Sequence, residues 1–266
     1  MEYTVAKTLG IEDTMLAPGS DTLVGAAPDS TAEVDPLDRG ARNLSFGVGE
    51  QLLFDINYGF INAGEAQMSV LDIVDWEGRP CYYVQTQAHS NSFFNSIFPV
   101  NDTVETIIDA VGLASWHFDR RLHEGSYNST RIYTFDQINN LAFYENDTTE
   151  VPPFIQDVLS AFYYVRTVDL KVGSVVTIQN FSRGKVAPFD VKVLRKETIE
   201  VPAGEFDCIV VEPMLKAAGI FKHEGRMTVW LTDDRLRMPV RMRSKVVVGS
   251  IDVVLKSFQL GEIEQF

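Results

Sequence analysis

The sequence is poor in cysteine, in positive charge and in long apolar runs, and each shortage limits what the protein can be. Its 266 residues include two cysteines, Cys81 and Cys208, and both lie in apolar runs typical of strands. We interpret them as buried structural thiols, and a disulfide between them stays open. No apolar run approaches the ~20 residues that a membrane-spanning helix requires. The N-terminus lacks a basic region followed by an apolar stretch, so no signal peptide is visible. Either the protein is cytoplasmic or Met1 is not the native start.

The charge balance argues against two classes of partner. The chain has 37 acidic and 23 basic residues, a net charge of −14 at pH 7 and a pI of about 4.7. Nucleic-acid binding needs a clustered positive surface, so no nucleic-acid partner is expected. Electrostatic docking on anionic lipid is disfavoured for the same reason.

Composition divides the chain at about residue 43. Residues 1–43 hold eight acidic residues against Lys7, Arg39 and Arg42, with few large apolar side chains and no clear period. Such a segment cannot bury enough surface to offset its ordering entropy. We therefore predict a disordered acidic leader or linker over 1–43 and a single antiparallel β domain over 44–266.

The pattern from residue 44 onward predicts strands. About a dozen apolar runs are separated by glycine, proline or charge roughly every 8 to 14 residues, a spacing typical of antiparallel sandwiches, barrels and curved sheets. In "FDVKVLRKETIEV", Val191 and Val193 alternate with Lys192 and Lys196, which indicates one buried and one wet face. The fold class expected is mainly β, with a strongly curved antiparallel sheet or half-barrel.

Two shorter stretches predict local structure. "VPAGEF", residues 201–206, has Pro202 to preset a turn and Gly204 to adopt positive φ, so it predicts a tight hairpin. "NSFFNSIFPV", residues 91–100, interrupts the strand pattern with aromatic residues and predicts a short helical or irregular element packed on the sheet.

One stretch, "PPFIQDVLSAFYYVR", indicates a helix over 154–166. Pro152 and Pro153 suit the start of a helix, where a missing N–H has no consequence. A lone helix of about three turns is marginal in water, so this one must lie on the sheet. We expect it to fill the concave face as a lid, through an apolar stripe of Ile155, Val158, Leu159, Phe162 and Val165.

Several long segments, in the same order, resemble the bacterial family called domain of unknown function 3108. They include "FGVGEQLLFDINYGFINAGEAQMSV", "SIFPVNDTVETIID", "FIQDVLSAFYYVRTVDLKVG" and "WLTDDRLRMPVRMRSKVVVGSI", and the likeness covers about residues 45–262. The resemblance implies a protein of the bacterial envelope, usually exported and periplasmic, with no established activity. It also implies a fold similar to the lipoprotein-localisation factors, a curved antiparallel sheet with its main helix on the concave side.

No motif predicts a metal, a cofactor or a catalytic residue. His117 and His123 would share a strand face but lie ~20 Å apart, too far for one metal. "HEG" occurs at 123–125 and again at 223–225, without the spacing of a metal motif. Ser160 lacks a nucleophile elbow, and no glycine-rich phosphate loop is present.

Candidate ligand-binding residues fall into two groups. "FDRRLHEGSYNSTR" places charged and aromatic residues on adjoining strands, where paired guanidinium groups could hold a carboxylate or phosphate. Cross-strand ion pairing on a wet face is the competing interpretation. The second group belongs to the predicted helix. The candidates are Arg120, Glu124, Tyr127, Arg131, Asp157, Phe162, Tyr163 and Arg166.

Three functions remain open. The leading hypothesis is a non-enzymatic binding or carrier module for a lipid, another apolar small molecule or a segment of an envelope protein, held between sheet and helix. The alternatives are an enzyme acting on a small aromatic or carbohydrate substrate, and an envelope scaffold without a ligand. A large dry cavity would favour the carrier, a ring of tyrosine, arginine and acids with perturbed pKa values the enzyme, and a filled core the scaffold.

Overall fold

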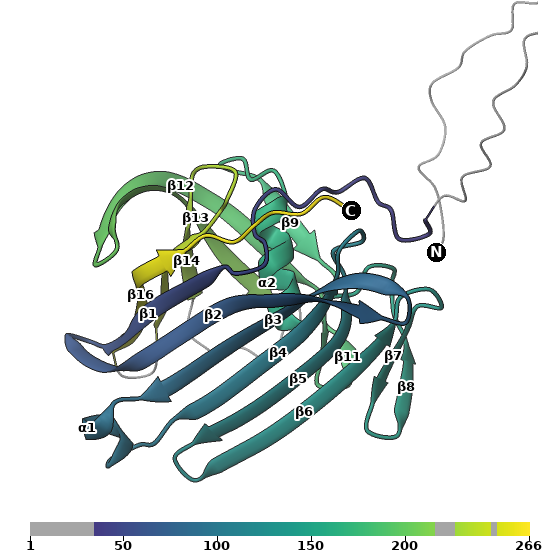
Figure 1. Ribbon diagram of the computed structural model, residues 1–266. Helices are drawn as coiled ribbons and strands as arrows, with labels where there is room; N and C mark the ends of the chain where they lie inside the picture. The colour runs from purple at the N-terminus through teal and green to yellow at the C-terminus, as the bar shows by residue number, and fades with distance from the viewer. Residues whose placement is uncertain (1–34, 216–226, 246–248) are drawn as a thin grey trace, which may run out of the picture. The chain divides into compact units, whose positions relative to one another are not determined.

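The computed structural model describes residues 35–215, 227–245 and 249–266. Fourteen strands form one antiparallel sheet, and two short strands form a separate ribbon (Figure 1). The strands are β1 Gln51–Tyr58, β2 Ile61–Trp76, β3 Arg79–Ser90, β4 Asn101–Asp109, β5 Ser115–Glu124, β6 Tyr127–Asp136, β7 Leu141–Tyr144, β8 Asp147–Glu150, β9 Val175–Ile178, β10 Phe181–Ser182, β11 Lys185–Val186, β12 Phe189–Val201, β13 Gly204–Leu215, β14 Met227–Thr232, β15 Pro239–Lys245 and β16 Ser250–Gln259.

The large sheet consists of two meanders joined edge to edge. Strands β1 to β8 follow one another in order, and β16 back to β12 continue on the other side of β1, ending at β9. The junction is the pairing of β1 with β16, which brings segments about 200 residues apart side by side. Strands β8 and β9 form the two edges, so the sheet is curved but not closed (Figure 1). The predicted class, a mainly β curved antiparallel sheet with a helix on its concave face, is confirmed.

The main helix, α2, spans Val158–Thr167 and begins four residues later than predicted. Phe154 has a φ of 58°, which interrupts any helix that starts at Pro152 or Pro153. Asp157 is the N-cap and accepts hydrogen bonds from the backbone N–H groups of Leu159 and Ser160. This capping box sets the start, because the first N–H groups of a helix need outside acceptors.

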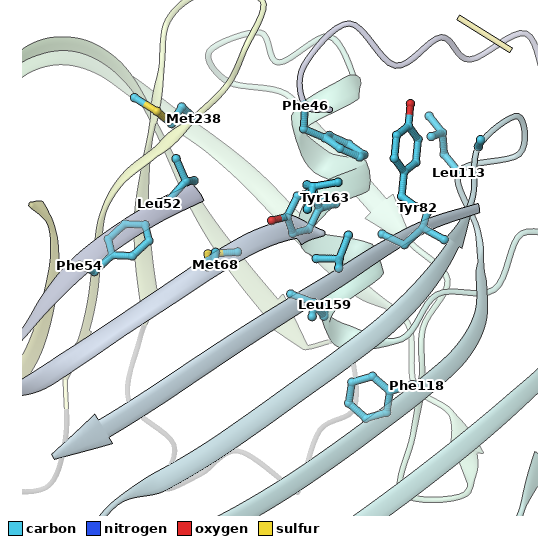
Figure 2. Close-up of a cluster of buried hydrophobic side chains, with 14 of the residues drawn as sticks. Phe46, Leu52, Phe54, Met68, Tyr82, Leu113, Phe118, Leu159, Tyr163 and Met238 are labelled. Atoms are coloured by element: carbon cyan, nitrogen blue, oxygen red, sulfur yellow. The ribbon is translucent and has the colours of Figure 1, made fainter. Parts of the chain in front are cut away.

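Helix α2 packs on the concave face and links two hydrophobic clusters (Figure 1). Leu159 and Tyr163 belong to the larger cluster, with Phe46 and Tyr82 (Figure 2). Ala161 and Val165 belong to a second cluster, formed with β12, β13 and β14. The predicted apolar stripe was wrong in part, because Val158 is 57% exposed and Ile155 precedes the helix. The half-buried Phe162 touches both clusters.

Residues 35–43 contact the domain, so the boundary predicted at residue 43 differs from the structure. Leu37 is buried against Trp116, and Asp35 forms a bidentate ion pair with Arg79 at 3.0–3.1 Å. The Arg39 guanidinium lies 4.0 Å from the Tyr164 ring centre. The sequence pattern missed these contacts because each is made by an isolated residue in a polar segment. The remainder of the predicted leader, 1–34, lies outside the described residues.

The short helix α1, Ser92–Asn95, confirms the predicted helical element, but it is not packed on the sheet as expected. Phe93, Ile97 and Phe98 are all more than half exposed. The Asn91 side chain caps the helix by accepting a hydrogen bond from the Phe94 N–H, so the turn forms from local hydrogen bonds rather than burial.

Both cysteines are buried and unpaired, which confirms their interpretation as buried thiols. Cys81 lies on β3 and Cys208 on β13. Burial raises the pKa of each thiol to about 12, so both are inert as nucleophiles at neutral pH.

The hairpin turn at Pro202–Ala203 has the predicted glycine conformation, since Val201 pairs with Gly204 and Gly204 has a φ of 132°. We expect Gly204→Val to destabilise the fold by about 1–2 kcal/mol, because a β-branched residue is strained at positive φ. Urea unfolding measures this change. An unchanged midpoint would contradict the strain.

Candidate functional site

The β5–β6 hairpin brings four of the predicted ligand-binding residues onto one face. Arg120 pairs across the strands with Arg131, and Glu124 pairs with Tyr127. Phe118 and Tyr133 form the next pair beyond the arginines, and both are buried in the main core. The arginines therefore lie where the packed half of the concave face ends and its open half begins.

Arg120 and Arg131 face each other without a counter-ion at contact distance. Within the described residues, neither forms an ion pair within 4 Å, and the buried Nε of Arg120 has no hydrogen-bond partner. Burial lowers the pKa of Arg120, and the charge of Arg131 lowers it further. Like charges directly opposite on a sheet are destabilising. Cross-strand ion pairing, the competing interpretation, is not found at this pair among the described residues, whereas Arg121 of the same segment does pair with Glu105 on β4.

Arg121 shows the contrast, because it points to the other face of β5. It forms a short ion pair with Asp119 and approaches Glu105 at 3.8 Å. The pKa of Arg121 is raised by these carboxylates, first by its hydrogen bond to Asp119. Arg120 and Arg121 are thus adjacent on β5 but differ in their surroundings. Carboxylates balance the charge of Arg121, whereas Arg120 has no ion-pair partner within 4 Å among the described residues.

A small recess lies beside the arginine pair. Its aromatic walls come from Phe118 and Tyr133 on the hairpin and from Phe181 on β10. Val158, the first residue of α2, and Ser182 complete the lining with the two arginines. Its volume is about 20 Å³, room for roughly one water. It cannot enclose a ligand, so a ligand here would lie on the open face and place one polar group in the recess.

A pair of carboxyl groups lies near the tip of the same hairpin. Burial raises the pKa of Glu124, and the charge of Asp102 raises it further. Burial likewise raises the pKa of Asp102, against the hydrogen bond that it accepts from the His123 N–H at 2.8 Å. The positive charge of Arg120 lowers the pKa of both groups, so Arg120 lies close enough to interact with them electrostatically.

We expect Glu124→Gln to stabilise the protein at pH 7 by about 0.2–1 kcal/mol, the range for relief of a like-charge pair. Because both folded-state pKa values are raised, the stability from protonation is present below the ordinary values of 3.8 and 4.5 and is lost as pH rises through the raised values. The gain should therefore shrink at pH 3.5. Urea unfolding at both pH values measures it, with the exposed Glu205→Gln as control. An equal gain at both pH values would contradict the coupling.

The other four predicted residues belong to the helix and its contacts. Asp157 is fully buried and accepts hydrogen bonds from the Thr106 and Ser115 hydroxyls, both at 2.6 Å, besides the two of its capping role. Burial raises the pKa of Asp157, and these hydrogen bonds oppose the shift. The carboxyl group therefore fixes the start of α2 to β4 and β5, and does not face the recess.

Arg166, Tyr163 and Phe162 also contact the core rather than the hairpin site. The Arg166 guanidinium binds both Glu50 carboxylate oxygens at 2.7 Å and donates to the Ser45 carbonyl at 3.0 Å. The Tyr163 ring meets the Phe46 ring edge to face at 4.8 Å (Figure 2). The structure thus groups the hairpin candidates into one site and places the helix candidates in the packing of α2.

A larger recess lies elsewhere, where the C-terminal segment meets residues 38–43. It is about 250 Å³ and is lined by Asp38, Gly40, Ala41, Arg42, Asn43, Ala110, Val111, Glu264, Gln265 and Phe266. Its charged groups are of both signs, and it contains none of the predicted residues. We therefore place the candidate site on the hairpin, where two arginines face each other and an anion would balance their charge.

The described residues contain no group of three His, Cys, Asp or Glu side chains arranged to hold a metal. No helix among them is long and apolar enough to cross a membrane. The second "HEG" segment, 223–225, lies outside the described residues.

Sequence reasoning missed two members of the site, Asp102 and Phe181. Asp102 lies on β4, and the register of β4 on β5 brings it to Glu124. In the sequence, Asp102 is visible as an acidic residue in "VNDTVETIID", but this segment does not show which residue of β5 it lies beside. Phe181 belongs to a two-residue strand, too short to show any alternation.

The fold and the site define a class: an open, curved antiparallel sheet with a helix packed on its concave face and, beside that packing, a pair of facing arginines. Residues 53–256 match the family model described as protein of unknown function (DUF3108). The chain belongs to this family. No curated protein matches it.

Solved structures support the fold. A β-barrel-like protein of domain of unknown function 1849 from Brucella abortus matches with a TM-score of 0.53 and 9% identity, over 82% of this chain and 99% of that one. A candidate lipoprotein from Parabacteroides distasonis matches with a TM-score of 0.38 and 11% identity, over the same shares. At this identity the first likeness shows the fold alone, and the second carries no argument.

Proposed function

We propose that this protein is a non-enzymatic binding module of the bacterial cell envelope. Its ligand is an amphiphile with an acidic group, or an acidic partner segment, held on the open half of the concave face by Arg120 and Arg131. The observation that carries the proposal is the cross-strand arginine pair, for which the described residues supply no ion-pair partner within 4 Å, in a chain of net charge −14. The envelope location rests on the family resemblance.

The chemistry of the recess supports an anion with an apolar part. Two guanidinium groups side by side match the geometry of a carboxylate or phosphate, which accepts paired N–H bonds. Within the described residues the buried Nε of Arg120 has no hydrogen-bond partner, so the donors of this guanidinium are not already used by the protein. Phe118, Tyr133 and Phe181 supply apolar surface directly beside it.

The space between sheet and helix, which the sequence favoured for the ligand, is occupied by side chains. By the criterion stated above, the described residues therefore lack the large dry cavity of a carrier and have the filled core of a scaffold, so a ligand held between sheet and helix is not proposed. Leu159, Ala161 and Tyr163 are each at most 7% exposed and pack into the two clusters. The two recesses described above lie at the margins of this core. We therefore place the ligand on the open face and treat α2 as a packed support.

Isothermal titration calorimetry with dodecyl phosphate tests the proposal. We expect saturable binding, and a loss of about tenfold or more in affinity for Arg120→Gln and for Arg131→Gln, since a hydrogen bond to a charged group is worth about 1.5–3 kcal/mol. Dodecyl maltoside, which has the same chain and no charge, should bind more weakly than dodecyl phosphate.

Arg121→Gln is the matched control, one residue away on the opposite face of β5. It should bind dodecyl phosphate like the unmodified chain, because Arg121 is paired with Asp119. Equal affinity for all four proteins, or no binding at all, would contradict the proposal.

An enzyme is the second candidate, and one observation favours it. Two carboxyl groups with raised pKa values, Asp102 and Glu124, lie near Arg120 and Tyr127, as general acid–base chemistry would require. The open recess of about 20 Å³ does not enclose a substrate or exclude water from it, which is why we favour binding.

A further inference from the structure

One end of the sheet carries a surface of exposed apolar side chains, which we name the apolar rim. Three connections contribute to it: the β1–β2 turn, the β3–β4 segment with α1, and the β5–β6 turn (Figure 1). Each member is at least 40% exposed, and Phe60, at the apex of its turn, is fully exposed. The members are Tyr58, Phe60, Ile61, Phe93, Ile97, Phe98 and Tyr127.

Direct contacts join the three connections into one surface. The Asn91 side chain donates a hydrogen bond to the Asn62 carbonyl at 2.7 Å, which ties α1 to the β1–β2 turn. The Gly125 N–H donates to the Pro99 carbonyl at 2.7 Å, and the Phe98 ring lies against Gly125. The rim is therefore continuous across the ends of six strands.

The three connections themselves carry no charge, in a chain in which 23% of residues are charged, and the carboxyl groups of Asp102 and Glu124 lie at the strand ends behind them. Residues 56–64, 90–100 and 125–130 include no Asp, Glu, Lys or Arg. Their polar side chains are neutral, and several bind the backbone of the rim itself: Asn91 caps α1, and the Ser96 hydroxyl donates to the Phe93 carbonyl at 2.7 Å. Such loops can enter a medium of low dielectric without burying a charge or leaving these backbone groups unpaired.

We propose that the apolar rim inserts into the surface of a zwitterionic lipid bilayer. Aromatic side chains flanked by neutral polar groups suit the boundary between headgroups and acyl chains. The net charge of −14 opposes attraction to anionic lipid, so apolar insertion provides the binding free energy. A bilayer is favoured over a protein partner because Phe60 projects from the apex of a turn, where a soft medium can surround it on all sides.

Flotation of the full chain with phosphatidylcholine vesicles tests this. We expect the protein to float with the vesicles and to bind less as phosphatidylglycerol replaces phosphatidylcholine. Replacing Phe60, Phe93 and Ile97 together by serine should lower the partition coefficient about tenfold or more, given the apolar area withdrawn from lipid. Sedimentation of the same samples without vesicles measures self-association.

The control replaces three exposed apolar residues outside the rim, Ile138, Val172 and Leu260, by serine. This variant should bind vesicles like the unmodified chain. Equal loss in both variants, or no flotation of the unmodified chain, would overturn the proposal. So would a dimer that forms without lipid and is abolished by the rim variant, because the rim would then pair with a second copy.

Discussion

Replacing Arg166 by methionine should destabilise the protein by about 3–5 kcal/mol. Both members of its ion pair with Glu50 are at most 2% exposed, so the substitution leaves a carboxylate buried without its partner. The same guanidinium binds the Ser45 and Leu236 carbonyls, which joins α2 to the segment before β1 and to the loop before β15. Urea unfolding measures the change.

Arg195→Met is the matched control, because Arg195 pairs with Glu197 on the exposed face of β12. It should cost no more than about 1 kcal/mol. Replacing Glu50 and Arg166 together by methionine should be less damaging than Arg166→Met alone, since no uncompensated charge remains. A double variant as unstable as the sum of the two single ones would contradict this account.

Tyr163→Ala should cost about 3–5 kcal/mol, as expected for removal of a fully buried aromatic ring. The ring packs against Phe46, in the segment before β1 (Figure 2), and also contacts the ring of Phe162. Its hydroxyl is buried and has no hydrogen-bond partner among the described residues. Tyr163→Phe should therefore be neutral or stabilising, because it removes an unsatisfied polar group and keeps the ring.

Phe162→Ala is the control for this pair, since Phe162 is adjacent in sequence and only half buried. It should cost clearly less than Tyr163→Ala. Similar losses for the two, or a large loss for Tyr163→Phe, would show that the packing of α2 differs from that described.

The strand pattern predicted the fold because alternation depends only on neighbouring residues. Val191 and Val193 are buried and Lys192 and Lys196 are exposed, as the pattern of "FDVKVLRKETIEV" required. The start of α2 was misplaced because Pro152 and Pro153 suggested an early start, whereas Phe154 adopts positive φ and Asp157 caps the helix. The helix face was misjudged because two buried residues of α2 are polar: Ser160 bonds to Asp157 within the capping box, and Arg166 binds Glu50, far away in the sequence.

The candidate site was predictable in its composition but not in its geometry. "FDRRLHEGSYNSTR" showed arginines on adjoining strands, and Gly125 marked the turn between them. Which arginine faces which depends on register, and a shift of one residue would place Arg121 on the concave face instead of Arg120. The partner of Arg166, 116 residues away, could not be inferred from local pattern at all.

The most direct test of the central claim observes the guanidinium groups themselves. Side-chain Nε–H signals of arginine can be followed by NMR in the full chain during titration with dodecyl phosphate. The account predicts that the signals of Arg120 and Arg131 shift together and saturably, and that the signal of Arg121 stays in place. Shifts confined to other residues, with Arg120 and Arg131 unchanged, would contradict an anion site on the concave face.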